Sequence, residues 1–160
     1  GQEDHQHGSN RFIYREPIRI PAIMACILGS CITMASVMVI FNLALAHHLT
    51  GVEKTRDRVL LRKAVKLYEL ALSIARTQGL AEDSVLFHLA VINNLAQLHK
   101  ELKQDVLAET CFHQLLSLLM YLLDSSREEQ GTLLSSSYEE FLSNVYHLII
   151  PGCSAVATAA

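Results

Sequence analysis

The sequence predicts an all-α fold built from repeated helix-turn-helix units. From Pro21 onward, apolar residues recur at the three- and four-residue spacing of helices rather than at the alternating spacing of strands. Gly51, Gly79 and Pro151 punctuate this pattern at the ends of candidate segments. Two distant stretches also share one register, which indicates an internal repeat.

The elements follow one another along the chain. Residues 11–21 are rich in β-branched and aromatic side chains and are interrupted by Pro17 and Pro21, which predicts an extended arm. Ser137 and Glu140 match a capping box at the start of the last helix. The helices are expected at residues 35–50, 60–77, 82–103, 105–123 and 138–149. The predicted divisions are a tail and arm (1–21), a two-repeat domain (22–124), a linker (125–137), a C-terminal capping helix (138–150) and a tail (151–160).

Residues 20–52 contain no Asp, Glu, Lys or Arg. A helix that is hydrophobic all round is either buried or in a bilayer, and this run is long enough to span one. Ser, Thr, Asn and His interrupt the run, and basic residues flank both ends, so no charge bias orients a span. We therefore expect one or two buried helices here, with a membrane anchor through residues 20–40 as the alternative.

The internal repeat is visible in both helices of each unit. Residues 42–44 (Asn-Leu-Ala) recur at residues 94–96, 52 positions later. In the second helix of each unit, Ala64 and Tyr68 correspond to Ala108 and Phe112, 44 positions later. The smaller offset places the difference in the turn after Gly51, so the first unit has the longer turn.

This pattern resembles the tetratricopeptide repeat over about residues 35–123, in a long form similar to the repeats of kinesin light chain. The chain also resembles a group of uncharacterised diatom repeat proteins. The matching positions are Leu43, Ala44, His47, Gly51, Ala64, Tyr68 and Ala71 in the first copy, and Leu95, Ala96, His99, Ala108, Phe112 and Leu115 in the second. Histidine replaces the usual tyrosine, Lys103 replaces the turn glycine, and Leu115 replaces an alanine. The resemblance implies two repeats closed by a C-terminal capping helix.

The resemblance also implies a concave groove, lined by the first helices, that binds a protein or peptide partner. Asparagine amides in such a groove can hydrogen-bond an extended backbone, although Asn42 and Asn94 could instead bridge within the repeat. The lysine clamp that some family members use for a C-terminal carboxylate is replaced here by Phe41 and Ala90. The groove residues carried over are Phe41, Asn42, Leu45, His48, Asn93, Asn94, Gln97 and Lys100.

Other classes of function have little support in the sequence. A net charge of −3 and 6% aromatic residues argue against nucleic-acid binding. The histidines and the four cysteines show neither His-x-x-x-His nor Cys-x-x-Cys spacing, so we expect no metal site and no cofactor. With no nucleophile–base pattern, we expect a non-catalytic interaction or assembly module. Scattered cysteines favour a reducing, intracellular and cytoplasmic setting. The alternative is a membrane-associated structural subunit anchored through residues 20–40.

Two repeats are fewer than the three that such arrays usually need. The arm is the best internal candidate for covering the remaining apolar surface, since Phe12, Ile13, Tyr14, Ile18 and Ile20 are apolar and Pro17 keeps the arm from forming a helix. We expect it to pack across its own helices or across those of a second copy, which would give a homodimer by arm exchange. The small residues Ala44, Ala64, Ala96 and Ala108 are expected at buried helix contacts.

Overall fold

A computed structural model describes residues 12–19, 29–54, 56–77, 85–129 and 135–149. These residues contain five helices and no strand, which confirms the all-α prediction. The helices are α1 (Gly29–Glu53), α2 (Arg58–Thr77), α3 (Val85–Glu101), α4 (Asp105–Glu129) and α5 (Ser135–Ile149). Residues 12–19 form a segment without helix or strand, the arm.

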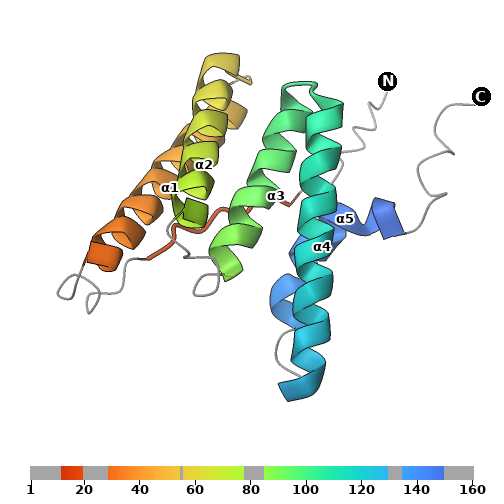
Figure 1. Cartoon of the computed structure of the whole chain (residues 1–160). Helices are drawn as coiled ribbons and strands as arrows, with labels where there is room; N and C mark the ends of the chain where they lie inside the picture. The colour runs from red at the N-terminus through yellow and green to blue at the C-terminus, as the bar shows by residue number, and fades with distance from the viewer. Residues whose placement is uncertain (1–11, 20–28, 55, 78–84, 130–134, 150–160) are drawn as a thin grey trace, which may run out of the picture.

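The helices are arranged as two neighbouring hairpins and a fifth helix. α1 packs along α2, α3 packs along α4, and the hairpins meet through α2 and α3. α5 packs against α4 and also touches α3. The arm crosses this series of helices, passing α1 and α3 toward α5 (Figure 1). The first and last parts of the chain are therefore brought together by one extended segment.

Gly51 does not have the predicted role of ending a helix. Gly51 lies inside α1, which continues to Glu53, so it does not end the helix. A Cβ atom at this position would lie 2.8 Å from the Cδ2 atom of Leu61, closer than side chains normally approach. Gly51 allows α1 and α2 to come close together there, since a larger residue would have to displace the Leu61 side chain. Gly79, the other predicted helix end, lies outside the described residues.

The predicted linker was mostly wrong. α4 extends to Glu129 and α5 begins at Ser135, so Ser137 lies within α5 and is not its N-cap. The polar composition of residues 125–129 suggested a loop. However, glutamate and arginine are good helix formers, and polar side chains are compatible with a helix. Helix α1 has 25 residues and is likewise longer than the helix predicted at residues 35–50.

The turn between α3 and α4 shows how a lysine replaces a turn glycine. Lys103 adopts the left-handed conformation, with a φ of 60°. The N–H of Lys103 donates to the carbonyl of Lys100 at 3.0 Å, and the N–H of Gln104 donates to that of His99 at 2.8 Å. These two bonds form a Schellman motif, which ordinarily has glycine at the position of Lys103. The tight connection sets α4 beside α3.

The core centres on α3, in which every residue from Phe87 to His99 is buried. α1 is buried on its inner face, while its outer face exposes apolar side chains such as Ile32, Val39 and Leu43. By length and composition alone, two stretches within the described helices could cross a membrane, Ile32–Glu53 and Asp105–Asp124. Burial accounts for only part of the apolar character of α1, because 39% of the first stretch is buried, and 22% of the second.

Replacing Ala64 or Ala108 by Leu should destabilise the fold. Both alanines have no exposed surface, as do Ala44 and Ala96, so extra methylenes would overpack the helix contacts. We expect Ala64→Leu and Ala108→Leu each to lower the free energy of unfolding by about 1–3 kcal/mol, measured by chemical denaturation. Ala46 lies exposed on α1, so Ala46→Leu is the matched control and should change stability by less than about 0.5 kcal/mol. Equal effects at all three sites would disprove the repeat alignment.

Candidate functional site

Asparagine side chains from three helices converge on the arm. Asn42 in α1 accepts a hydrogen bond from the N–H of Ile18 at 2.9 Å and donates to its carbonyl at 3.0 Å. Asn94 in α3 does the same for Tyr14, at 2.9 and 3.0 Å. Each amide thus pairs with both backbone polar groups of one arm residue.

The third amide belongs to α5. Asn144 accepts from the N–H of Phe12 at 3.2 Å and donates to its carbonyl at 2.7 Å. In an extended chain the N–H and C=O of one residue point to the same side, and every second residue faces that side. The sequence positions of Phe12, Tyr14 and Ile18 differ by even numbers, so one edge of the arm faces all three helices.

Asn94 uses its full hydrogen-bonding capacity. A primary amide has two N–H donors and two acceptor lone pairs. Besides the two bonds to Tyr14, Asn94 donates to the hydroxyl of Tyr68 at 3.0 Å and accepts from the Nδ2 of Asn93 at 3.2 Å. Asn94 is completely buried, so this saturation avoids the cost of a buried unpaired polar group.

Asn93 links the α3 and α5 amides. Its Nδ2 also donates to the carbonyl of Phe12 at 3.2 Å, and its Oδ1 accepts from the Nδ2 of Asn144 at 2.6 Å. Asn93 has no exposed surface. The arm, α2, α3 and α5 are therefore joined through one buried polar network.

Aromatic rings hold the arm beside the amides. The ring of Phe12 meets that of Phe141 edge-on, with centroids 5.2 Å apart. The ring of Tyr14 stacks on Phe141 at 6.0 Å and lies tilted against Phe41 at 6.3 Å. Partial burial raises the pKa of Tyr14, and the neighbouring Glu16 acts in the same direction, so the phenol stays neutral. The groove therefore combines backbone hydrogen bonds with aromatic contacts.

The structure separates the eight groove residues predicted from the sequence into two sets. Phe41, Asn42, Asn93 and Asn94 contact the arm directly through hydrogen bonds or ring packing. The others are buried or turned elsewhere: Leu45, His48 and Gln97 are buried, and the Nζ of Lys100 lies 5.5 Å from the centre of the Phe112 ring on α4. Both readings of Asn94 hold, since it bridges to Tyr68 within the helices and also binds the arm.

Sequence reasoning missed two groove residues on α5. Asn144 supplies the third amide, and Phe141 contacts both arm aromatics. A signal was available, because Asn144 follows Asn94 by 50 residues, close to the 52 that separate Asn94 from Asn42. The arm was expected to pack either across its own helices or across those of a second copy. In this structure it packs across its own helices.

His48 is a buried histidine beneath the groove. It has no exposed surface, and neither ring nitrogen has a hydrogen-bond partner. Its ring lies edge-on to Tyr68, with centroids 6.2 Å apart. Burial lowers the pKa of His48 to about 4, and Arg15 on the arm acts in the same direction. The imidazole is therefore neutral at physiological pH.

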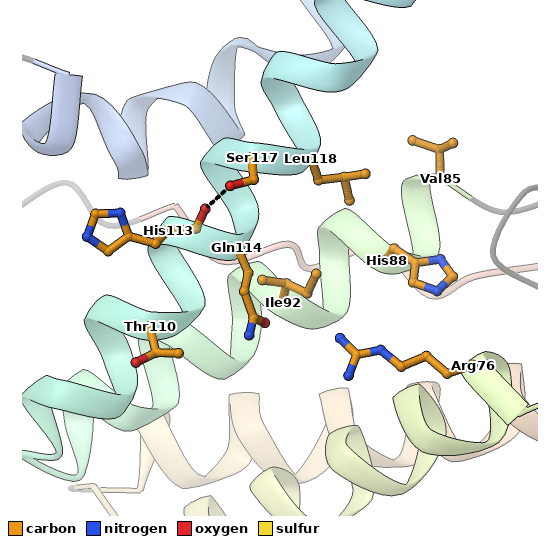
Figure 2. A pocket seen from close by; sticks show the side chains of 9 residues that line it. All are labelled: Arg76, Val85, His88, Ile92, Thr110, His113, Gln114, Ser117 and Leu118. Carbon is orange, nitrogen blue, oxygen red and sulfur yellow. Dashed lines mark hydrogen bonds between the residues drawn. The ribbon is translucent and has the colours of Figure 1, made fainter.

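A separate hollow of about 600 Å³ lies between α2, α3 and α4. Arg76, His88 and Gln114 extend into it, whereas His113 points away (Figure 2). The hydroxyl of Ser117 donates to the carbonyl of His113 in its own helix at 2.9 Å. No group of three metal-binding side chains occurs among the described residues. The polar groups of this hollow do not converge on one point, unlike those of the groove.

Removing the amide of Asn94 should cost more stability than removing that of Asn42. Asn94→Ala leaves Tyr14, Tyr68 and Asn93 short of partners in a buried site, for an expected loss of about 2–3 kcal/mol. Asn42→Ala affects only Ile18 at a half-buried position, for an expected loss of about 1 kcal/mol. Denaturant unfolding of both variants makes the comparison. Equal losses would contradict the proposed importance of the network.

Acid should destabilise the fold through His48. Its folded pKa of about 4 lies below the usual unfolded value of about 6.5, so protonation favours unfolding. The stability is intact above about pH 6.5 and is lost as pH falls toward 4, by up to about 3 kcal/mol. We expect His48→Leu to flatten this part of the stability–pH curve, measured by urea denaturation. An unchanged stability–pH curve for His48→Leu would contradict this role of His48.

Comparisons with protein-family models, with curated proteins and with solved structures return no match for this chain. The description of the site therefore comes from its own geometry. Amides from α1, α3 and α5 pair with the backbone of an extended segment, and rings from α1 and α5 contact its side chains.

Proposed function

We propose that this chain is a non-catalytic protein-interaction module whose groove binds an extended protein segment through its backbone. The observation that carries the proposal is the pairing of Asn42, Asn94 and Asn144 with both backbone polar groups of alternate arm residues. Extended segments added along a protein surface are commonly bound in this way, with main-chain bonds for affinity and pockets for specificity. In this proposal the arm is an intramolecular ligand of the groove.

The helical arrangement supports a tetratricopeptide-like array. Two hairpins lie side by side, and their matched small residues Ala44, Ala64, Ala96 and Ala108 are all fully buried. α5 presents Asn144 and Phe141 to the arm, as α1 presents Asn42 and Phe41. In the proposed array, α5 is therefore the first helix of a third unit as well as a cap.

A tethered arm would compete with any partner for the groove, so a partner would bind only by displacing the arm. A ligand held by a short linker has an effective concentration in the millimolar range, so a free competitor must outbind it. The arm is only partly buried, and Arg15, Glu16 and Pro17 are exposed to solvent. Displacement by a partner would then cost the arm contacts and leave the helices as a preformed groove.

The test is to cut the arm from the folded full-length chain. A specific protease site inserted between Ala22 and Ile23 allows folding first and cleavage afterwards. We expect the cut chain to take up a dye-labelled peptide of residues 11–20 saturably, in a fluorescence anisotropy titration, and the uncut chain to bind it at least about 10-fold more weakly because of the tethered competitor.

The control for this test is Asn42→Ala, which removes one amide contact at the α1 end and should weaken uptake by the cut chain. No uptake after cleavage would contradict the proposal.

The alternative, a membrane-associated subunit anchored through residues 20–40, finds support in the apolar outer face of α1, where Ile32 is 72% exposed. It predicts that the chain sediments with lipid vesicles and takes up no peptide.

A further inference from the structure

We infer that the groove selects extended segments with aromatic residues at their first and third positions and an aliphatic residue at the seventh. The segment would run with its N-terminal end on α5 and its C-terminal end on α1. In the arm these positions are Phe12, Tyr14 and Ile18. The inference rests on the proposed function, since it names the class of partner that the groove would accept.

The amides fix the reading frame. Asn144, Asn94 and Asn42 pair with the backbone of positions one, three and seven, respectively. Each pairing needs an N–H group, and proline has none. Proline is therefore excluded at these positions and is accepted at the intervening even positions, whose N–H groups face away. Pro17 occupies position six of the arm, in agreement with this rule.

The spacing also fixes the direction. The positions that pair with Asn144 and Asn94 are two apart in the sequence, whereas those that pair with Asn94 and Asn42 are four apart. A segment running the opposite way would place positions one, five and seven on the amides. Its two aromatic residues would then have to lie near α1, away from the ring of Phe141 on α5.

The side-chain preference follows from the rings around the arm. Position one meets Phe141 edge-on at 5.2 Å, and position three lies between Phe141 and Phe41 at 6.0 and 6.3 Å. These centroid distances fall in the range in which aromatic pairs attract beyond simple burial. Position seven, Ile18, packs against the core. An aliphatic side chain fits this contact, and it gains from leaving water.

The helices make few contacts with the middle of the segment. Positions four to six, which are Arg15, Glu16 and Pro17 in the arm, are exposed. No hydrogen bond joins their backbone to a helix within the described part of the chain. The accepted class is therefore an internal, extended and amphipathic segment with a variable centre, and a free C-terminal carboxylate is not required.

The experiment uses the cut chain with a series of competing peptides of residues 11–20. N-methylation at Tyr14 removes the N–H that Asn94 binds, whereas N-methylation at Arg15 stiffens the backbone similarly but removes an N–H that bonds to no helix among the described residues. We expect the first to weaken competition by at least about 10-fold and the second by less than about 3-fold. Replacing Phe12 and Tyr14 of the peptide together by serine should weaken it by at least about 30-fold.

One protein is used throughout, so no result depends on whether a variant of the chain folds. Equal binding of the two N-methylated peptides would overturn the reading frame, and full binding of the serine peptide would overturn the aromatic preference. In either case the native peptide still binds, so the proposed function would stand. Failure of the native peptide to bind is instead the failure of the proposed function.

Discussion

The structure depends on the pairing of a buried side-chain amide with the backbone of an extended segment. An asparagine side chain has the same donor and acceptor as a peptide group, so it can replace a neighbouring strand for one residue. The helices use their own backbone groups internally and have none to offer a passing chain. Asn42, Asn94 and Asn144 supply the missing groups. In this way helices can hold a segment that is neither helix nor strand through its backbone.

Burial makes this pairing both costly to lose and specific. Asn93 and Asn94 are buried while the arm is in place, so loss of the arm would leave their polar atoms to be satisfied by water or by another segment. Binding of some extended segment therefore stabilises the groove as well as the ligand. The arm meets that need within the chain, where it joins α1, α3 and α5 across the two hairpins. The same need would make the groove receptive to a replacement segment.

The helical packing positions the amides through small residues and close approaches. Gly51 lets α1 approach α2 beside Leu61, and the left-handed Lys103 turns the chain directly from α3 into α4. Fully buried alanines permit similar contacts within both hairpins. These features set the distance between neighbouring helices, and that distance sets which residues of an extended segment can meet an amide. The positions at which the three amides meet the arm are thus linked to features far from the arm.

The sequence by itself determined the all-α class and the approximate positions of the helices. Periodicity and composition are local properties, so the all-α class could be predicted from spacing, whereas Asn42, Asn93 and Asn94 were carried over from the resemblance to the tetratricopeptide repeat. The role of Asn144, the burial of His48 and the path of the arm were decided only by the tertiary structure. The reason is that Phe12 and Asn144 are 132 residues apart, and no local feature of either segment indicates that the two are in contact. Only the packing of α5 beside α3 brings the two ends of the chain together.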